Sequence, residues 1–446
     1  MLKQKWFKIV LLMLFSGSLW AATASTFVFN AKDTPDIARA VDFARNNQKA
    51  VVIQGTANNS NQNSGAVYLN LHDFKDLITL HLKRKTMLVE SGMTWNEAQQ
   101  LVAPFGLSLK FIPAQANEPI FQTINNNQSG LSPQNPLVAD GVASIRLLQP
   151  DGKMVYVSRE KTPELWRGIF GAQGALGVIL DVKLKLTENR NLIRHAERIS
   201  YRDYPAYLRD QIQDNADVSA SFARIDVVPG KDFLNDMYVV SYWIKDRESA
   251  ESPRLHPVRN HIASSVYQWS EKGDWAKRMR WQIETALLAN TALHTELTSA
   301  DLLLRQARAI DAQSRQVYYI PVAQFVPFMD DLRTLAIEQK WSFNQVSVHY
   351  LEKPSDLLLA PQQGNTLAII VNTSKTSLAE QQAVTPALID LALKHDGGFT
   401  LDPSTTQDLA KVKLAYPQLS EFQQLKATHD AKGLFASTLS PGPKES

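Results

Sequence analysis

The sequence predicts an α+β protein that folds as two domains. Its 446 residues exceed the usual size of a single domain. Helix and strand signals alternate in short order up to about residue 190, and beyond it strands separated by helices predict an antiparallel sheet. The composition, with 44% hydrophobic and 20% charged residues, is that of a globular protein. The chain has no cysteine, which excludes disulfides, thiolate metal ligands and cysteine nucleophiles.

Residues 1 to 24 are typical of a secretory signal peptide. Three lysines precede an apolar run at residues 9 to 15, and Ala22-Thr23-Ala24 supplies a small-residue cleavage site. We therefore expect an exported protein, either of the bacterial periplasm or secreted. No later apolar run is long enough to cross a bilayer. Three of the 47 basic residues and none of the 44 acidic ones lie in this segment, so the remainder has no net charge and we expect no nucleic-acid partner.

The first domain is expected at residues 25 to 190. Asp33-Thr34-Pro35 joins a capping residue to a helix-first proline, and Thr94 with Glu97 forms a capping box for a later helix. Asp151-Gly152 is a strong signal for a hairpin turn. The expected helices cover residues 35–46, 94–105 and 162–167, and the expected strands cover 50–54, 66–71, 87–91, 145–148, 154–158 and 178–186.

The second domain is expected at residues 191 to 395, as an antiparallel sheet with helices on one side. Its expected strands include 237–244, 317–325, 345–350 and 367–371, and helices are expected near 326–338 and 377–394, with a helix-rich stretch over 255–310. Residues 396 to 446 form a polar, helical closing segment.

Two stretches of small residues are candidates for a binding site. Residues 55 to 65 join two strands with Gly, Ser, Asn and Thr, a composition that lets backbone N–H groups converge on an anion. A plain surface loop is the alternative. Residues 168 to 177 contain four glycines among apolar neighbours, which indicates close packing against a flat partner or another strand, or simply a tight turn.

Several segments occur together in a recognisable order. They include Val51-Val52-Ile53-Gln54-Gly55, then Gly92-Met93-Thr94-Trp95, the 151–152 hairpin and Gly171-Ala172-Gln173-Gly174-Ala175-Leu176-Gly177-Val178-Ile179. From about residue 27 to 186 this order resembles the FAD-binding domain of the vanillyl-alcohol oxidase and p-cresol methylhydroxylase (PCMH-type) superfamily. Gly397-Gly398-Phe399 and the segment from 416 to 437 look like the branch that contains sugar-lactone oxidases and decaprenylphosphoryl-ribose oxidase.

This resemblance implies a two-domain PCMH-type FAD-binding fold, in which the antiparallel sheet forms a substrate (cap) domain and the closing segment returns to the FAD domain. It implies an FAD-dependent oxidoreductase that transfers hydride to the flavin from an alcohol group of a sugar, lactone or polyol-type substrate. FAD is expected to be non-covalent, since neither His nor Cys occurs between Val51 and Leu71. The implied cofactor-binding residues are Gly55, Thr56, Ala57, Asn58, Asn59 and Ser60 for the pyrophosphate, and Gly171, Gly174, Gly177 and Val178 for the adenine and ribose.

A second pyrophosphate loop of the family corresponds to residues 119–130, where Asn125 and Gly130 are the candidate ligands. Phe121 and Gln122 stand where relatives carry two glycines, and Ser129 stands where they carry His. These departures keep another interpretation open, namely a binding or interaction protein on the same fold without turnover. A role in the assembly of the cell envelope, unrelated to redox chemistry, is a third interpretation.

His349 and Tyr350 are the catalytic candidates. They end a predicted strand where relatives place residues on the substrate side of the flavin, which suits an acid–base or substrate-orienting role. A histidine packed within the strand is the alternative. Tyr318 and Tyr319 are candidates for the same cavity or for the core. No His and carboxylate cluster has metal-ligand spacing, so no metal site is predicted.

One further segment, residues 267 to 281, interleaves aromatic side chains with Lys and Arg. This composition suits peripheral contact with a membrane interface or a lipid-linked small-molecule substrate. A cap-domain helix with buried Trp residues and solvated basic residues is the alternative, and this composition favours it.

Overall fold

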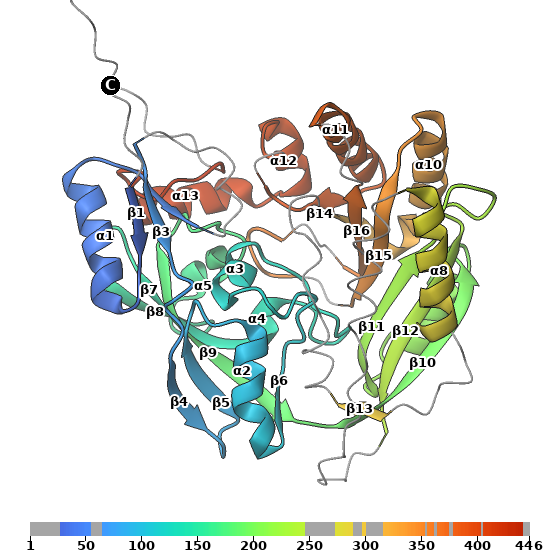
Figure 1. Ribbon diagram of the computed structural model, residues 1–446. Coiled ribbons are helices and arrows are strands. Elements are labelled where there is room, and N and C mark those ends of the chain that lie inside the picture. Colours follow the sequence, from blue (N-terminus) through green and yellow to red (C-terminus); the bar gives the residue numbers. More distant parts are fainter. Residues whose placement is uncertain are drawn as a thin grey trace, which may run out of the picture.

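Figure 1 shows the computed structural model of the chain. The structure describes residues 27–54, 65–245, 273–288, 297–299, 315–352, 355–360, 364–373, 378–402 and 405–439. The predicted signal peptide, the first loop at residues 55–60 and residues 267–272 of the aromatic and basic segment lie outside these ranges.

The first domain begins with a small parallel sheet. Its strand order is β1 (Phe27–Asn30), β3 (Val67–Asn70) and β2 (Val51–Ile53). α1 (Thr34–Asn46) follows β1, and the side chain of Asp33 caps it by accepting a hydrogen bond from Asp36 N. The helix buries residues at positions 37, 40, 41 and 44, the spacing of one helical face. The predicted helix over 35–46 is therefore confirmed.

A larger antiparallel sheet follows, and β9 lies at its centre. The strand order is β4 (Leu77–His81), β5 (Thr86–Glu90), β9 (Val178–Glu188), β7 (Val142–Leu148) and β8 (Met154–Val157), while β6 (Leu107–Leu109) also pairs with β9. The predicted hairpin at Asp151-Gly152 joins β7 to β8. Because β9 begins directly after the glycine run and its Val178 pairs with Leu148, the sheet fixes one end of that run.

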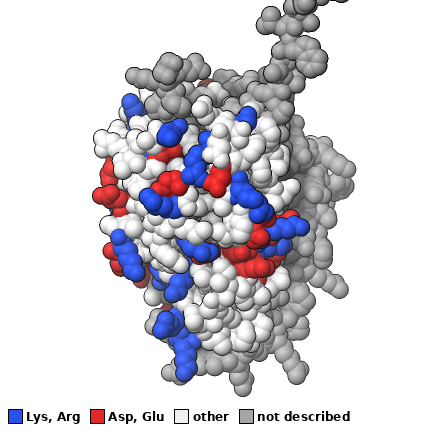
Figure 2. Space-filling model, turned by 90° about the vertical axis from the view of Figure 1, so that its left-hand side faces the viewer, with Lys and Arg blue, Asp and Glu red and all other residues white. Residues whose placement is uncertain are grey.

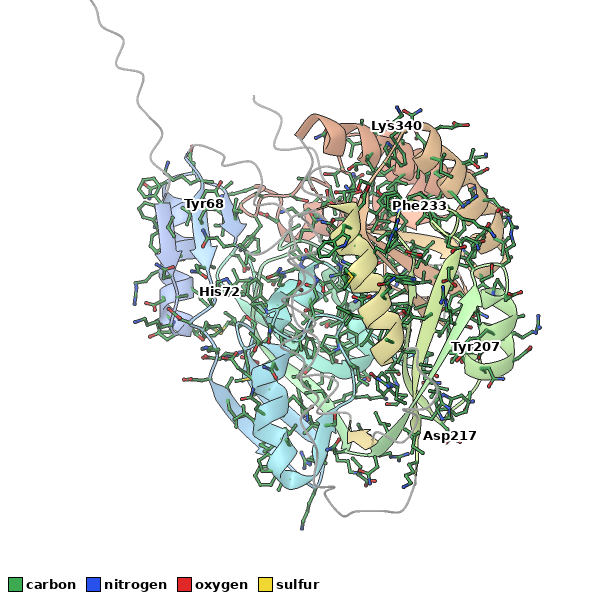
Figure 3. All side chains as sticks on the ribbon, turned by 45° about the vertical axis from the view of Figure 1, so that its right-hand side comes forward. Tyr68, His72, Tyr207, Asp217, Phe233 and Lys340 are labelled. Atoms are coloured by element: carbon green, nitrogen blue, oxygen red, sulfur yellow. The ribbon has the colours of Figure 1, made fainter. Side chains whose placement is uncertain are left out.

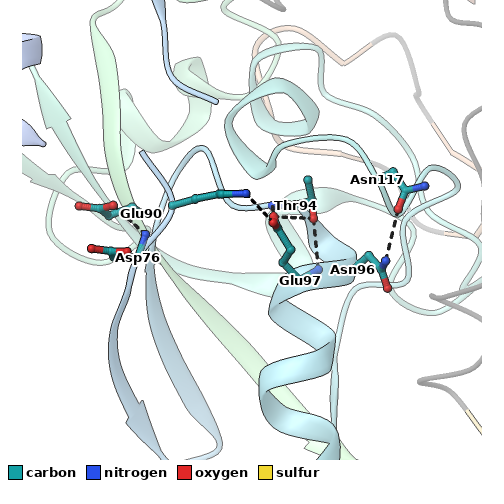
Figure 4. A network of polar contacts seen from close by, with 7 residues as sticks. Asp76, Glu90, Thr94, Asn96, Glu97 and Asn117 are labelled. Atoms are coloured by element: carbon teal, nitrogen blue, oxygen red, sulfur yellow. Dashed lines mark hydrogen bonds and ion pairs between the residues drawn. The ribbon is translucent and has the colours of Figure 1, made fainter. Parts of the chain in front are cut away.

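The helices that follow in this domain are short, and a capping box begins the first of them. They are α2 (Trp95–Val102) with the 3₁₀ turn η2 (Ala103–Phe105), α3 (Ile120–Asn125), α4 (Val138–Gly141) and α5 (Pro163–Ile169). Figure 4 shows the cap of α2, where Glu97 N donates to Thr94 Oγ1 at 3.1 Å and Thr94 N donates to Glu97 Oε2 at 2.9 Å. Lys75 Nζ pairs with Glu97 Oε1 at 2.8 Å. The predicted capping box is confirmed.

The second domain is built on an eight-stranded sheet in which every neighbouring pair is antiparallel. The α+β class and the antiparallel second sheet are thereby confirmed. Its order is β13 (Leu297–Ser299), β10 (Asn191–Ser200), β12 (Asp236–Ile244), β11 (Val218–Ile225), β15 (Phe343–Leu351), β16 (Thr366–Thr373), β14 (Arg315–Pro321) and β17 (Gly398–Phe399).

Helices cover both faces of this sheet, whereas the sequence predicted helices on one side. Three connections between its strands are helical. β10 is followed by α6 (Tyr204–Tyr207) and the π-helical turn η3 (Leu208–Ile212), β14 by η6 (Val322–Gln324) and α10 (Phe325–Glu338), and β16 by α11 (Leu378–Lys394). The ring of Phe325 packs edge-on against Tyr204, 5.6 Å between centroids. α8 (Asp274–Leu288) lies on the opposite face, where Trp281 contacts Tyr238 of β12 at 5.4 Å. We call this second face, which includes Arg224 opposite Tyr238, the inner face.

The closing segment contributes to both domains. Its first part, β17, pairs with β14 at the edge of the large sheet, although the sequence predicted that residues 396–446 return to the FAD domain. α12 (Leu409–Ala415) and α13 (Leu419–His429) follow. Residues 434–436 then lie beside β2, since Val51 N donates to Leu434 O at 2.7 Å and Ala436 N donates to Val51 O at 3.0 Å.

One hydrophobic core runs through the two domains. Figure 3 shows side chains filling the space between Tyr68 and His72 of the first domain and Phe233 of the second. Direct hydrogen bonds join the domains, such as Ser221 N to Leu131 O at 2.8 Å and Leu358 N to Arg167 O at 2.9 Å. Among the described residues, no helix has the length and apolar content that a bilayer crossing requires.

Candidate functional site

The glycine run and the second predicted loop lie directly against each other. Gly171 N donates to Ile124 O at 3.0 Å, Gln173 N donates to Asn125 O at 3.0 Å, and Gly174 N donates to Asn125 Oδ1 at 3.1 Å. The end of α3 is thus fastened to the turn that precedes β9. Two stretches predicted to share a cofactor, around Asn125 and around Gly171 to Gly174, meet in space.

The glycines of the run permit close packing on both sides. Gly177 has a φ of +139°, and a Cβ at this position would lie 2.3 Å from Leu148 O. Gly174 has a φ of +83°, and its Cβ would lie 2.9 Å from the Ile53 side chain. No other residue type fits such positions without strain. Gly177 and Val178 therefore serve the junction with β7, while Gly174 packs on β2.

Three consecutive asparagines at the end of α3 carry buried polar atoms that have no hydrogen-bond partner among the described residues. These atoms are Asn125 Nδ2, Asn126 Oδ1 and Asn127 Oδ1. Asn127, with a φ of +44°, uses its Nδ2 to donate to Leu359 O at 3.2 Å. A buried polar group without a partner costs about 1–3 kcal/mol. This cluster is therefore poised to bind a polar ligand.

A small pocket lies where the two domains and the closing segment meet. Asn126, Asn127 and Gly171 line it from the first domain, and Tyr319, Thr400 and Tyr416 line it from the other parts. About 10 Å³ is accessible to the centre of a water molecule, the room that one water needs. The pocket can therefore be one end of a cofactor site but not the whole of it.

Gln173 joins three parts of the chain at this pocket. Its Nε2 donates to Leu401 O at 2.7 Å, and its Oε1 accepts from Thr438 Oγ1 at 3.2 Å. The sequence analysis did not single out Gln173. In the structure its φ of +53° is unusual for a residue with a side chain. Its place in the sequence between Gly171 and Gly174 was the signal that could have pointed to it.

Other predicted cofactor residues lie elsewhere. Gly130 packs against Phe111 and Ile112, where a Cβ would come within 2.7 Å of the Phe111 ring and 2.6 Å of Ile112 O. It does not line the junction pocket. Phe121 is buried in the core, so the bulk that replaces a glycine points into the domain. Gly55, Thr56, Ala57, Asn58, Asn59 and Ser60 lie outside the described residues.

The inner face of the large sheet presents polar side chains towards the first domain. Arg315 of β14, Asn372 of β16 and Gln345 of β15 lie opposite one another in one row. His349 follows four residues after Gln345 on the same face. The atoms Gln345 Oε1, Asn372 Oδ1 and His349 Nδ1 are buried, and no described residue forms a hydrogen bond with them.

His349 is neutral in this environment. Burial, followed by the positive charges of Arg315 and Arg224, lowers its pKa to about 3. A neutral imidazole with an unpartnered ring nitrogen can accept or donate one proton. The structure thus places the predicted His349 on the face that meets the first domain.

Tyr350 points to the opposite face, because neighbouring residues of a strand alternate. Its hydroxyl lies in the electrostatic environment of Tyr204, among the helices of the outer face. We therefore remove Tyr350 from the catalytic pair that the sequence predicted with His349. The same alternation separates Tyr318 from Tyr319, and Tyr319 alone lines the junction pocket.

A charged cluster bridges the domains at the edge of this face. Gln115, with its amide oriented to satisfy both neighbours, donates to Glu118 and accepts from Arg315 Nη1 at 2.8 Å. Glu118 is 7% exposed, and its Oε2 has no partner within hydrogen-bond distance among the described residues. Burial raises its pKa, although Arg315 and the Gln128 side chain act to lower it. Sequence reasoning missed this cluster because its members are 197 positions apart at their widest, from Glu118 to Arg315.

Metal chemistry has no visible support in the described part of the chain. No group of three or more His, Cys, Asp or Glu side chains there has the arrangement of a metal site.

Comparison with known proteins supports an FAD-binding domain in the N-terminal part of the chain. Residues 25–158 match a family model described as an FAD binding domain. L-galactono-1,4-lactone dehydrogenase 2, mitochondrial, of Oryza sativa subsp. japonica is 27% identical over 132 residues, which are 30% of this chain and 23% of that protein.

Two further relatives extend this similarity. Cytokinin dehydrogenase 2 of Arabidopsis thaliana is 25% identical over 216 residues, 46% of this chain and 41% of that protein. A putative D-arabinono-1,4-lactone oxidase of Neurospora crassa is 21% identical over 171 residues, 37% of this chain and 31% of that protein. The matched region spans less than half the length of each of these relatives.

Proposed function

Because the N-terminal part of this chain belongs to the PCMH-type FAD-binding superfamily, we propose that the protein is an FAD-dependent oxidoreductase that oxidises an alcohol group of a sugar, lactone or polyol. The chain carries an FAD-binding domain, and FAD is its cofactor. Relatives with this domain include proteins named as lactone dehydrogenases and as a lactone oxidase. The alcohol substrate and the reaction direction are our proposal.

The residues of the junction fit FAD in chemical type. FAD offers phosphate, ribose and ring groups that both accept and donate hydrogen bonds. The unpartnered atoms Asn125 Nδ2, Asn126 Oδ1 and Asn127 Oδ1 supply the complementary donors and acceptors. In this proposal the asparagine cluster and Gly171 hold the cofactor without a covalent bond. When bound, FAD supplies a hydride acceptor, and the protein supplies position and electrostatics.

The single observation that carries the substrate class is the set of unpartnered acceptors across the junction. Glu118 Oε2, Gln345 Oε1 and Asn372 Oδ1 are buried and accept no hydrogen bond from another described residue. Hydroxyl groups donate hydrogen bonds, so a ligand with several of them satisfies this set, whereas a hydrocarbon leaves it unpaired. These three acceptors would orient the substrate.

His349 is our candidate for orienting the substrate hydroxyl. Its ring is buried beside the cations Arg315 and Arg224, which favour the neutral form and oppose the uptake of a proton. The buried ring nitrogen Nδ1 can accept a hydrogen bond from the hydroxyl, provided the hydroxyl lies within hydrogen-bond reach. Arg315 would stabilise negative charge that develops on the substrate oxygen.

The decisive experiment measures flavin binding and flavin reduction separately. The purified chain is mixed with FAD, passed over gel filtration and examined by visible absorbance. We expect a retained flavin band that acid precipitation releases into the supernatant, as non-covalent binding requires. Under anaerobic conditions we expect L-galactono-1,4-lactone, D-arabinono-1,4-lactone, xylitol or sorbitol to bleach it. A yellow protein that none of the four reduces would contradict this substrate class.

A matched pair of variants tests the orienting role. Glu118→Gln keeps the shape but removes a charged acceptor, so we expect KM for the reducing substrate to rise about 10- to 100-fold at unchanged flavin content. Glu160→Gln removes an exposed carboxylate and should leave KM unchanged. Equal kinetics for both variants would remove Glu118 from the site.

A binding protein on the same fold is the second candidate function. The water-sized pocket and the packing of Leu359 against Gly171, whose Cβ position lies 3.0 Å from Leu359 Cβ, favour it. Protein that stays colourless after incubation with FAD would support this candidate and contradict the oxidoreductase.

Export also remains our proposal, and it rests on residues 1 to 24. Mass spectrometry of the protein recovered from a bacterial periplasmic fraction should give an N-terminus at or near Ser25. Protein found only in the cytoplasm with an intact Met1 would contradict export.

A further inference from the structure

We propose that the tip formed by the β4–β5 turn and the end of α2 docks onto an anionic lipid bilayer. We call this surface the basic tip and define it by Leu82, Lys83, Arg84, Phe105 and Lys110. The proposal goes beyond the oxidoreductase function and does not depend on flavin. Figure 2 shows the side of the molecule that carries these strands, with Lys and Arg side chains at its lower end.

Backbone hydrogen bonds bring the parts of the basic tip together. Leu186 N donates to Lys85 O at 2.8 Å, which holds the β4–β5 turn against β9. A few residues later, Asn189 N donates to Gly106 O at 2.9 Å and so holds the residue after Phe105. Lys110 N donates to Lys185 O at 3.1 Å on the same stretch. The turn, η2 and Lys110 therefore share one end of the sheet.

Large apolar side chains are exposed at this end. Leu82 is 44% exposed and Phe105 is 53% exposed, and Leu101 of α2, four residues before Phe105, is 36% exposed. Exposed apolar residues that are scattered singly need no explanation, but a group of them marks an interaction site. Leu82 and Phe105 stand on turns, where they can enter an acyl boundary without backbone rearrangement.

The same end is rich in positive charge. Lys83, Arg84 and Lys110 are exposed, and none of them forms an ion pair with another described residue. Lys85 is the exception, since its Nζ pairs with Glu188 at 2.6 Å. Lys110 is close enough to Lys185 to help burial lower the pKa of Lys185. Cations that crowd together in this way are complementary to a dense array of negative charge.

A lipid surface fits this combination better than a protein partner does. A stable protein interface needs about 800 Å² from each side, including a buried apolar centre. The basic tip instead offers separate apolar side chains on two turns surrounded by cations. Each Lys or Arg near an anionic membrane increases the affinity for that membrane by about tenfold or less, and apolar side chains that insert increase it further. The chain without residues 1 to 24 has no net charge, so the attraction is local.

Vesicle sedimentation tests the proposal. We would use the chain from residue 25 onward, which keeps every described residue and removes the apolar run at 9–15. The probes are vesicles of phosphatidylglycerol and phosphatidylcholine in equal parts, and vesicles of phosphatidylcholine alone. We expect binding to the anionic vesicles that weakens with salt, and at least tenfold weaker binding to the neutral ones.

Two double variants separate the basic tip from charge in general. Lys83→Glu with Arg84→Glu should reduce binding to anionic vesicles about thirtyfold. Lys340→Glu with Lys432→Glu makes the same charge change on exposed residues elsewhere, and Figure 3 places Lys340 at the far end of the second domain. This control should bind like the parent. Circular dichroism would show that both variants are folded.

Three outcomes overturn the proposal. The first is equal loss of binding in both double variants, which would make the attraction non-specific. The second is unchanged vesicle binding by the basic-tip variant, and the third is binding of a single-stranded oligonucleotide in place of vesicles at the same salt. Leu82→Ser with Phe105→Ser should weaken binding severalfold even at high salt, and an unchanged affinity would exclude insertion.

Discussion

The junction around Gly171 and the inner face of the large sheet are built in different ways. At the junction, backbone groups and glycines set the geometry, as in the bonds from Gly171 N to Ile124 O and from Gln173 N to Asn125 O. On the inner face, side chains of rigid strands set it, as in the row of Arg315, Asn372 and Gln345. This difference indicates which of the two regions can accept substitutions. A backbone-built junction tolerates few substitutions, whereas strand side chains can be exchanged while the sheet remains.

The largest effect is expected at the backbone-built junction. Gly177→Ala introduces a Cβ 2.3 Å from Leu148 O at a φ of +139°. We expect a loss of about 3 kcal/mol or more, because strain and overlap act together. Thermal unfolding followed by circular dichroism should show Tm lowered by roughly 6 to 12 °C. Gly364→Ala, where a Cβ meets open space, is the control. Equal Tm values for the two variants would show that the junction is not rigid.

The inner face should respond mainly to pH. The pKa of His349 is lowered to about 3 in the fold, against an ordinary value near 6.5. As the pH falls below 6.5, the unfolded chain binds a proton that the folded chain does not, so the folded state loses stability down to pH 3. This contribution is about 1.4 kcal/mol per pH unit. His349→Gln should remove it. Urea unfolding at pH 7, 6 and 5 measures the difference, and parallel curves for parent and variant would contradict a buried neutral His349.

A smaller effect is expected when a side chain supports the junction. Asn125→Ala leaves Gly174 N without its acceptor and should cost about 1–3 kcal/mol. Since it also removes Nδ2, we expect weaker retention of FAD on gel filtration. Asn126→Ala removes the neighbouring amide but leaves Gly174 N its acceptor, so it is the matched control and should keep the stability of the parent. If Asn125→Ala keeps full stability and full flavin content, the backbone alone maintains the junction.

The smallest effect concerns an exposed ion pair between the domains. Arg159 Nη1 pairs with Asp356 Oδ2 at 2.5 Å, and both side chains are 52% exposed. Such pairs contribute about 0–1 kcal/mol. Asp356→Ala should therefore change Tm by no more than a few degrees, since the buried Leu357, Leu358 and Leu359 keep this segment in place. A large fall in Tm would show that surface charge, rather than burial, holds the domains together.

Local patterns predicted much of the fold. The cap of α1 at Asp33, the capping box at Thr94 and the Asp151-Gly152 turn each depend on residues close in sequence, and all three are present. The edge strand β4 was not predicted, because its apolar side chains are exposed and show no clean alternation. The helix α3 was not predicted either, since its first turn has no capping side chain.

The candidate site was less accessible to sequence reasoning. The meeting of Asn125 with Gly174 followed from a family resemblance, and no local pattern demands it. His349 and Tyr350 were paired as neighbours, but a strand sends neighbours to opposite faces. The cluster of Gln115, Glu118 and Arg315 depends on the packing of two domains, which no spacing along the chain encodes.

The pairing of residues 434–436 with β2 has a consequence for how the protein matures. The first sheet needs a strand that is synthesised nearly 400 residues after its neighbour Val51. At ordinary rates of synthesis, roughly 20 to 80 s separate the two. Throughout that interval the edge of β2 has no permanent neighbour. The two ends of the chain therefore close this edge of the first sheet only after nearly the whole protein has been synthesised.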